Sequence, residues 1–485
     1  MDSFDLLIVG GGINGAAIAR DAAGRGQSVL LVEKDDLASH TSSASSKLIH
    51  GGLRYLEQYE FGLVRESLHE REILLRTAPH IVRPLKFVLP DPPGGRPFWV
   101  IRAGLLLYDL LAGRGSLPRS RGVGRKDAHL AAPLRPGLKL ATYWDAWVDD
   151  SRLVILNAVD ARDRGAEIAT RTELVSARRE GEFWVAGLSG GREVAARAIV
   201  NAAGPWVAEV LKGRLGADTK SRARLVKGSH ILVPRLWEGD QAYILQNEAD
   251  GRVVFALPYG DSSLIGTTDV PVARPEDAAV SEAEIAYLCA AANAYFTRQI
   301  APGEVGWSYA GIRSLYDDGE AEAKDVTRDY HLELDPAPGP ALLSVFGGKI
   351  TTARHLAAEA LDRLGVPGLK FTATNPLPGG NVSAAFNARL EKLGTWLPAP
   401  LLRRLAGAYG TRIEALLGDA ESLDDLGRHF GGGLYEAEVR YLVETEFART
   451  AEDILWRRTK LGLAMTQPEQ RALAAWLGTA APAPR

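Results

Sequence analysis

The sequence predicts an α/β fold of three parts: a discontinuous Rossmann-like dinucleotide-binding domain, an antiparallel-sheet substrate domain and a C-terminal helical cap. Three observations support this prediction. A glycine-rich fingerprint follows an apolar run at the N-terminus, and the pattern of a buried strand ending in small residues returns twice later. The stretch between those returns is rich in strand-like alternation, and the final part of the chain shows helical spacing.

The fingerprint is Gly10-x-Gly12-x-x-Gly15, preceded by the apolar residues 4–9 and followed by an alanine-rich helical pattern. Gly10 permits a tight turn, Gly12 lets backbone N–H groups approach a pyrophosphate, and Gly15 allows close packing of helix on strand. Glu33 ends the next predicted strand, where a carboxylate would accept hydrogen bonds from an adenosine ribose. This carboxylate argues against NADP, whereas the fingerprint leaves NAD and FAD open.

A second informative run, residues 45–55, follows the fingerprint closely. It combines hydroxyls, paired glycines, two cations and an imidazole. Burying so many polar groups without partners is costly, so the run predicts a ligand beside it.

Length and composition indicate a soluble α/β enzyme of two or three domains. The 485 residues are 46% hydrophobic and 24% charged, with 51 glycines. No apolar run reaches the roughly 18 residues of a transmembrane helix, and the first strand leaves no room for a signal peptide. The single cysteine, Cys289, excludes a disulfide relay, and the net charge of −3 gives no attraction to nucleic acid. We expect a cytoplasmic protein with no metal and no nucleic-acid partner.

Residues 59–76 are predicted to form a helix, and the next segment, 98–111, is almost wholly apolar. The basic loop 114–126 follows it, with five cations and no acid. This pairing is typical of an interfacial membrane helix. A buried helix with a solvated loop is the alternative, and the sequence leaves both open.

The middle of the chain contributes to both predicted sheets. A helix is expected over 150–164, strands over 167–188 and 192–200, and a buried strand ending in small residues over 198–206. In doubly wound sheets, ligands lie beyond the carboxyl ends of such strands. The second sheet and its helix are predicted from five later segments: 229–233, 242–246, 253–257, 263–266 and 281–296.

Residues 342–352 predict a second return to the nucleotide domain, as a strand, a glycine turn and a helix start. The linker 375–380 then leads to helical segments. The expected division is a dinucleotide domain (1–80, 145–224 and 341–374), a substrate domain (81–144 and 225–340, with the possible membrane-facing segment 98–126) and a cap (381–485).

The chain carries a set of distinctive motifs: GGGINGAAIARDAAGRG, SSASSKLIHGGLRYLE, NAAGPWV, KGSHI, IGTTD, GIRSL, TRDYH, LLSVFGGKITT, YEAEVRYLV and LWRRTKLGL. Together they resemble the FAD-dependent, aerobic-type glycerol-3-phosphate dehydrogenases of the D-amino-acid-oxidase-like superfamily. The resemblance implies noncovalent FAD and oxidation of sn-glycerol 3-phosphate to dihydroxyacetone phosphate, with hydride transfer from C2 to flavin N5. It also implies electron transfer to a membrane quinone, by a homodimer peripherally bound to the anionic surface of the cytoplasmic membrane.

One observation supports a quinone as the electron acceptor independently of the resemblance. No second GxGxxG follows a strand in the middle of the chain, so no NAD(P)H site is evident.

The resemblance further implies a substrate site lined by cations. Arg313 and Arg328 match the family's phosphate-binding arginines, and guanidinium forks suit a phosphate dianion. Arg54 and Lys349 match family positions in the same cavity, where they are expected to bind substrate and to assist catalysis.

A histidine is expected to remove the hydroxyl proton, because its pKa lies near neutrality. His230 matches a family active-site histidine and is the preferred base. His50, in the polar run, is the second choice, and the sequence does not decide between them.

The cofactor residues are expected from several separate segments. Ser45 and Ser46 should serve the flavin and its pyrophosphate, while Gly51 and Gly52 let the chain pass under the ring. The predicted set is Gly10, Gly12, Ile13, Asn14, Gly15, Glu33, Lys34, Thr41, Ser45, Ser46, Lys47, Gly51, Gly52, Ala203, Gly204, Trp206, Gly348, Lys349, Ile350 and Thr351.

Two other functions stay open on the sequence. One is an oxidase of the same fold that acts on an amine or a 2-hydroxy acid and uses oxygen; a carboxylate substrate would need only one arginine fork. The other is a flavin-bound sensor without turnover, which the density of polar residues in the motifs disfavours.

Overall fold

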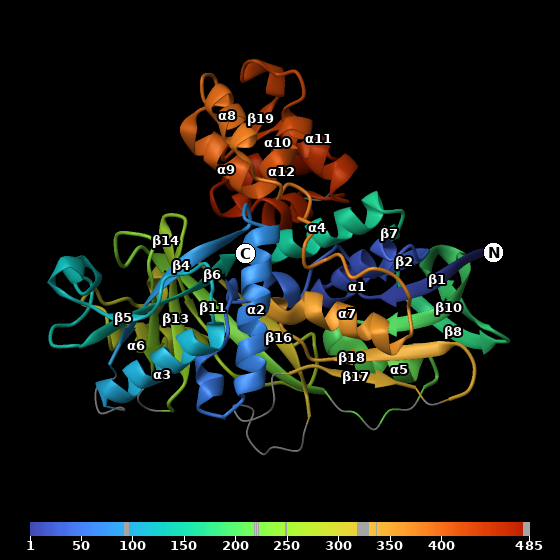
Figure 1. Cartoon of the computed structure of the whole chain (residues 1–485). Helices are drawn as coiled ribbons and strands as arrows, with labels where there is room; N and C mark the ends of the chain where they lie inside the picture. Colours follow the sequence, from blue (N-terminus) through green and yellow to red (C-terminus); the bar gives the residue numbers. More distant parts are fainter. Residues whose placement is uncertain are drawn as a thin grey trace.

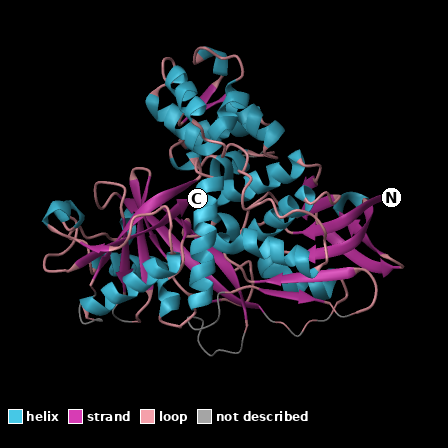
Figure 2. Cartoon of the chain, viewed as in Figure 1, coloured by secondary structure: helices cyan, strands magenta, loops and turns pink. Residues whose placement is uncertain are grey.

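The computed structural model describes residues 1–91, 97–217, 219, 221, 223–247, 250–317, 329–335 and 337–478. Two sheets lie side by side, and a helical domain stands above them (Figures 1 and 2). The N-terminal strand and the segments that return later share the sheet on the right of Figure 1. The predicted α/β fold class, with its helical cap, is confirmed.

The first sheet is built from parallel strands of separate parts of the chain. Its order is β17-β18-β10-β1-β2-β7, with only the β17–β18 pair antiparallel on this path, and the β8–β9 hairpin extends β10. The strands are β1 Asp2–Val9, β2 Val29–Glu33, β7 Glu167–Thr170, β8 Leu174–Glu180, β9 Phe183–Leu188, β10 Glu193–Asn201, β17 His331–Leu334 and β18 Ala341–Phe346.

Helices cover both faces of this sheet. On one face pack α1 (Ile13–Gly24), α4 (Asp150–Asp163) and α7 (Ala353–Arg363), and on the other α5 (Val207–Arg214). A Cβ at Gly15 would lie 1.9 Å from the Gly10 carbonyl oxygen, so this glycine allows the predicted close approach of α1 to β1.

The second sheet is antiparallel except for its β12–β4 pair. Its order is β15-β11-β14-β13-β12-β4-β6-β3, with β16 also beside β11 and β5 beside β6. The strands are β3 Leu48–Ile49, β4 Val82–Pro90, β5 Arg121–Gly122, β6 Leu140–Val148, β11 Ala223–Pro234, β12 Ala242–Gln246, β13 Val253–Tyr259, β14 Ser262–Gly266, β15 Val270–Pro271 and β16 Trp307–Tyr316.

Both faces of this sheet are also covered. α6 (Glu282–Asn293) packs on one face, and α2 (Phe61–Thr77) and α3 (Phe98–Ala112) on the other. Strands β3 and β17 join sheets other than those expected from their place in the chain. Alternation predicts that a segment is a strand but not which strand lies beside it, because pairing is set by distant residues.

The C-terminal domain has its own apolar core. Its elements are α8 Ala384–Leu393, α9 Ala399–Tyr409, α10 Ile413–Leu417, α11 Glu436–Thr445 and α12 Gln467–Trp476, a π-helix at Asp453–Arg458, and strands β19 His429–Gly431 and β20 Leu434–Tyr435. A buried ion pair joins this domain to α4: Arg152 donates to Glu446 Oε1 at 2.8 Å.

Helix α3 leaves much of its apolar surface uncovered. Only Leu105 and Tyr108 of this helix are buried, whereas Trp99, Leu106 and Leu110 are 71%, 57% and 64% exposed. In the single chain, α3 is therefore only partly buried, and its contact with a membrane stays a prediction. Among the described residues, no helix combines the length and apolar character needed to span a bilayer.

Candidate active site

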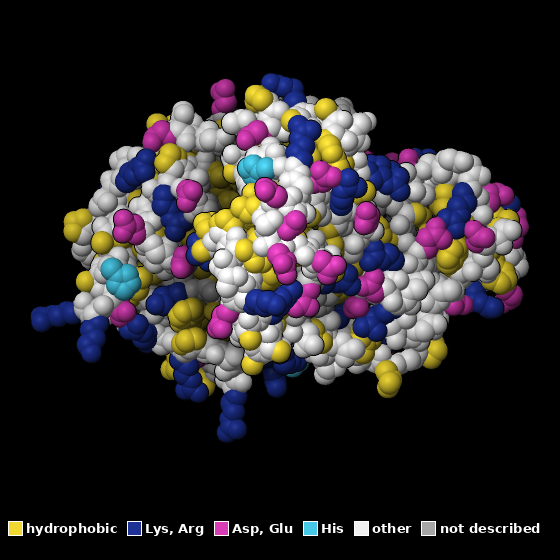
Figure 3. All heavy atoms as spheres, turned by 90° about the horizontal axis from the view of Figure 1, so that it is seen from above, with side chains coloured by type: hydrophobic (Ala, Val, Ile, Leu, Met, Phe, Trp, Pro, Cys, Tyr) yellow, Lys and Arg dark blue, Asp and Glu magenta, His cyan; other side chains and the backbone are white. Residues whose placement is uncertain are grey.

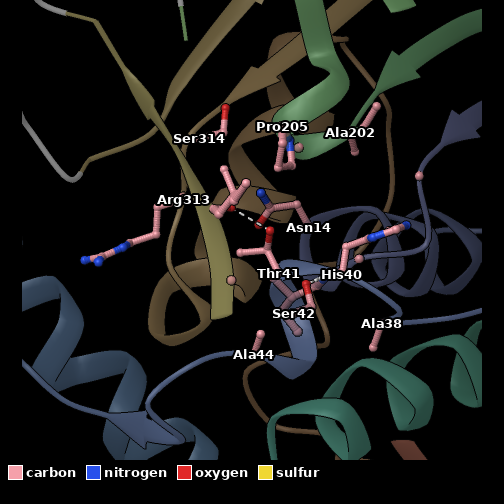
Figure 4. Close-up of a pocket in the computed structure, with 18 of the residues that line it drawn as sticks. Asn14, Ala38, His40, Thr41, Ser42, Ala44, Ala202, Pro205, Arg313 and Ser314 are labelled. Atoms are coloured by element: carbon pink, nitrogen blue, oxygen red, sulfur yellow. Dashed lines mark hydrogen bonds between the residues drawn. The ribbon is translucent and has the colours of Figure 1, made fainter. Parts of the chain in front are cut away.

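A cavity of about 380 Å³ lies where the carboxyl ends of β1, β2 and β10 meet the second sheet. Most of the predicted cofactor residues line it, as do both predicted histidines. Figure 4 shows residues of α1, of the segments after β2 and β10, and of β16 around one space. Doubly wound sheets bind their ligands at this position.

The fingerprint forms the predicted turn. Gly10 has φ +111°, and a Cβ there would lie 2.5 Å from the Ala202 carbonyl oxygen, so only glycine fits. The N-terminus of α1 follows directly, and Ser42 Oγ accepts the Ile13 N–H at 3.0 Å. A glycine turn at a helix N-terminus suits a pyrophosphate.

Glu33 ends β2 at the cavity wall, where the ribose is expected. Its Oε2 accepts the Gly11 N–H at 2.6 Å, and its Oε1 accepts the Asp35 N–H at 2.8 Å. Burial raises the pKa of this carboxyl, against the opposing effect of the two N–H donors. At the same end of the cavity, the Lys34 ammonium lies 3.8 Å from the centroid of the Trp206 ring.

The predicted hydroxyl residues line the cavity but are bound to other parts of the protein. Thr41 Oγ1 donates to the Ile312 carbonyl oxygen at 2.6 Å. Ser45 Oγ donates to Asp150 at 2.7 Å. These bonds fix the segment against β16 and α4, so the hydroxyls shape the cavity wall.

The Lys47 ammonium, predicted at the cofactor, lies away from the cavity wall. Its buried ammonium donates to both carboxylate oxygens of Asp150 at 2.9 Å, and Lys47 does not line the cavity. Asp150 lies 103 positions further along the chain, so no local pattern in the sequence indicates this ion pair.

Gly51, Gly52 and Arg54 also lie outside the cavity wall. Gly52 has φ +78°, and a Cβ there would lie 2.1 Å from the ring of Tyr55. The paired glycines make the turn that brings Tyr55 to the cavity. Tyr55 is the last residue of the polar run 45–55. Its place in the cavity wall was not predicted, because it depends on the turn at Gly52.

Four buried polar atoms of residues that line the cavity have no hydrogen-bond partner among the described residues: Asn14 Oδ1, His230 Nδ1, Ser314 Oγ and Lys349 Nζ. The Lys349 ammonium lies 4.0 Å from the centroid of the Tyr55 ring. Asn14 Nδ2 donates to the Gly347 carbonyl oxygen at 3.2 Å. Because unpartnered buried polar groups are costly, these atoms fit a polar ligand such as FAD.

Arg313 lies on β16 at the cavity, and its side chain is directed away from Asn14 (Figure 4). Its Nη2 lies 2.7 Å from Asp269 Oδ1 and donates to the Thr268 carbonyl oxygen at 2.7 Å. A Cβ at Gly228 would lie 2.6 Å from this nitrogen, so glycine makes room for the guanidinium. Thr268 and Asp269 belong to the IGTTD motif. The sequence did not predict that they hold the Arg313 guanidinium.

Arg328, the second predicted phosphate ligand, lies outside the described residues.

His230 is fully enclosed at the cavity wall. Its Nε2 lies 2.9 Å from Ser46 Oγ, and its ring stacks on Tyr309 with centroids 4.8 Å apart. Burial and the nearby charges of Lys47 and Arg313 lower the pKa of His230 to about 3. The imidazole is therefore neutral near pH 7, and the same causes make it a weak base in the absence of substrate.

His50 lines the same cavity, with its ring 6.0 Å from that of Phe255. The arrangement can therefore hold a dinucleotide, offer cations to an anion and supply a neutral histidine as a base. It does not decide which histidine acts.

Two family models match the chain. The model described as FAD dependent oxidoreductase matches residues 5–354. The model described as the C-terminal domain of alpha-glycerophosphate oxidase matches residues 371–482.

Known proteins match over nearly the whole chain. D-erythritol 1-phosphate dehydrogenase of Brucella abortus is 50% identical, with 99% of this chain and 98% of that protein covered. Glycerol-3-phosphate dehydrogenase of Pseudomonas aeruginosa is 52% identical, with coverage of 98% and 95%. The solved structure of glycerol-3-phosphate dehydrogenase from Bacillus halodurans complexed with FAD has a TM-score of 0.73 and 28% identity, covering 95% of this chain and 86% of that one. The chain therefore belongs to the FAD-dependent oxidoreductase family, within the group of the FAD-dependent glycerol-3-phosphate dehydrogenases, and its cofactor is FAD.

Proposed function

We propose that this chain oxidises sn-glycerol 3-phosphate to dihydroxyacetone phosphate with bound FAD. The observation that carries the proposal is that one cavity joins the dinucleotide turn, Arg313 and two histidines. The full-length relatives support a polyol phosphate as the substrate class. Because one of them is a D-erythritol 1-phosphate dehydrogenase, that four-carbon phosphate is the second candidate substrate.

Arg313 is the proposed phosphate ligand. Asp269 and the Thr268 carbonyl oxygen hold its Nη2, which orients the guanidinium plane at the cavity. A guanidinium binds a phosphate by charge-assisted hydrogen bonds. We propose Arg328 as the second phosphate ligand and Lys349 as a further cation at the substrate.

His230 is the proposed base, and its low pKa follows partly from Arg313. When a phosphate dianion binds beside Arg313, its negative charge offsets that cation. The protonated imidazole is then less unfavourable, so the pKa of His230 rises when the substrate is present. His50 is the alternative base.

FAD, when bound, accepts the hydride from C2 of the substrate. The chain holds the phosphate at Arg313, takes the hydroxyl proton on a histidine, and provides the Lys349 ammonium at the cavity wall. The unpartnered Lys349 Nζ is suited to stabilise negative charge that develops during the reaction.

A membrane quinone is the proposed electron acceptor. The sequence has no second dinucleotide fingerprint after a strand, which argues against NAD(P)H as the partner. The alternative is an oxidase of the same fold that acts on an amine or a 2-hydroxy acid and uses oxygen. The homodimer expected from the resemblance stays a prediction.

The proposed membrane contact is the apolar surface of α3, formed by Trp99, Leu106, Leu107 and Leu110. These exposed side chains precede the exposed cations of the loop 114–126. On the face seen in Figure 3, basic and acidic side chains are interspersed, so no field of one sign covers that face. We propose that attraction to an anionic membrane comes from the cations of the loop 114–126, each contributing about 1 kcal/mol at the lipid surface.

The proposed activity predicts that sn-glycerol 3-phosphate bleaches the flavin absorbance of the purified protein under anaerobic conditions. D-erythritol 1-phosphate, glycerol, a 2-hydroxy acid and an amine serve as comparisons. Glycerol should fail, because it lacks the phosphate that Arg313 would bind. Reduction by the hydroxy acid or the amine but by neither phosphate would overturn the proposal in favour of the oxidase.

Arg313→Ala should raise KM for sn-glycerol 3-phosphate about 10- to 100-fold, because charge-assisted bonds to the phosphate are lost. Steady-state kinetics with a soluble dye acceptor measure the change. Arg274→Ala is the control, since Arg274 has a side chain 72% exposed and pairs with Asp277. An unchanged KM in Arg313→Ala would contradict the phosphate assignment.

His230→Asn should slow flavin reduction by sn-glycerol 3-phosphate about 10²- to 10⁴-fold, the usual contribution of a general base. Anaerobic stopped-flow absorbance measures the rate, and the visible spectrum checks that FAD is bound. His50→Asn is the matched comparison and should have a smaller effect. The reverse order would transfer the role of base to His50.

The double substitution of Trp99→Ser and Leu110→Ser should weaken binding to vesicles with anionic phospholipid about tenfold or more, because two large apolar side chains no longer enter the lipid. Flotation of protein with the vesicles measures binding. Leu369→Ser is the control, since Leu369 is 85% exposed outside the α3 surface. Equal flotation of all three proteins would exclude α3 as the contact.

A further inference from the structure

A buried ion cluster joins the C-terminal domain to the segment that follows β2. Arg457 Nε lies 2.6 Å from Asp36 Oδ2, and Arg458 Nη2 lies 2.8 Å from Asp36 Oδ1. All three residues are less than 9% exposed. One carboxylate of the FAD-binding part is thus enclosed by two guanidinium groups of another domain.

Other ion pairs and hydrogen bonds also hold the guanidinium groups of Arg457 and Arg458 in place. Arg457 Nη2 pairs with Asp453 at 2.5 Å, and Asp453 also pairs with Arg171 at 2.8 Å. Arg458 Nη2 donates to the Glu446 carbonyl oxygen at 2.7 Å. The arginines stand at the end of the π-helix Asp453–Arg458, a rare element that is frequent at functional sites.

Asp36 in turn sets the position of the cavity wall. The Ser39 N–H donates to the Asp36 carbonyl oxygen at 3.2 Å, and the Ala38 N–H donates to the Gly11 carbonyl oxygen at 3.1 Å. Ala38 has φ +59°, a strained conformation for a residue with a Cβ, so its surroundings have to hold it. Both Ala38 and Ser39 line the cavity.

The C-terminal domain also contacts Asp149, which lies beside a residue that holds the cavity wall. Lys460 Nζ, two residues after the π-helix, lies 3.4 Å from Asp149 Oδ1. The next residue, Asp150, binds Ser45 and Lys47. The C-terminal domain therefore contacts the segment 36–47 directly at Asp36, and it contacts Asp149, the neighbour of the residue that holds the other end of this segment.

We propose that Asp36, Arg457 and Arg458 form a cofactor clamp, through which the C-terminal domain sets the affinity for FAD. They are positioning residues: they shape the wall at Ala38 and Ser39 and do not contact the substrate. The proposal depends on FAD binding and not on which substrate is oxidised. Removing the charge of Asp36 leaves the buried Arg458 guanidinium without its carboxylate and Arg457 with Asp453 as its remaining buried carboxylate partner, which shifts this wall.

The test compares Asp36→Asn with Glu446→Gln in the purified full-length holoenzyme. Glu446 is the matched control, because its buried side chain pairs with Arg152 of α4, which joins the same two domains without contacting Asp36. Glu446→Gln keeps the main-chain carbonyl oxygen that accepts from Arg458. Ultrafiltration at graded protein concentrations gives the Kd for FAD, and circular dichroism gives Tm of the FAD-depleted protein. Asp36→Asn should raise the Kd about tenfold or more, which corresponds to about 1.4 kcal/mol. Glu446→Gln should change the Kd less than about twofold, although it breaks a pair of the same kind.

Arg457→Gln keeps the contact between Arg458 and Asp36, so it provides a milder variant if Asp36→Asn does not fold. It should raise the Kd by less than Asp36→Asn, with the visible spectrum of the bound flavin altered. Equal increases in the Kd of Glu446→Gln and of the clamp variants would overturn the proposal, since domain docking in general would then explain the effect. An unchanged Kd in Arg457→Gln and Asp36→Asn would also overturn it.

Discussion

The site depends on how the chain between β2 and β3 is held. This segment has one short 3₁₀ turn, at Thr41–Ser43, and its residues Ala38 and Lys47 have positive φ. Such residues keep their conformation only where the surroundings impose it. Here the constraint comes from side chains: Thr41 bonds to β16, Lys47 pairs with Asp150, and Asp36 pairs with the C-terminal domain.

Electrostatics follow from the same arrangement. Burial keeps the imidazole of His230 neutral, and the positive charges of Lys47 and Arg313 act in the same direction. A cation-rich site attracts an anionic substrate but also weakens a nearby histidine as a base. A dianionic substrate would relieve this conflict, because the charge that it brings lies beside the cation that lowers the pKa. Substrate binding and base strength would then be coupled through Arg313.

The strand register of the second sheet determines which of its side chains lie at the proposed substrate site. In the antiparallel pair of β11 and β16, His230 lies opposite Tyr309, and Val226 lies opposite Arg313. Tyr309 and Arg313 are four residues apart, so the two-residue period of a strand places them on the same face of β16. This register places Tyr309, which stacks on the proposed base His230, on the same face of β16 as the proposed phosphate ligand Arg313.

The sequence by itself determined the fold class and the turn at Gly10, and most of the cofactor residues that it predicted line the cavity. These features depend on local rules: glycine at positive φ, a helix N-terminus after a strand, and the hydrophobic period of each element. The motifs added the family and FAD, since they are specific only in combination.

Only the tertiary structure decided which polar residues face the cavity. Lys47 was expected at the cofactor, but its ammonium pairs with Asp150, whereas Tyr55 reaches the cavity through the turn at Gly52. The contact of Asp36 with Arg457 joins residues 421 positions apart, and nothing in the local sequence indicates it. The physical reason is the same in each case: a buried charge needs a partner, and the partner is chosen by the packing of distant segments.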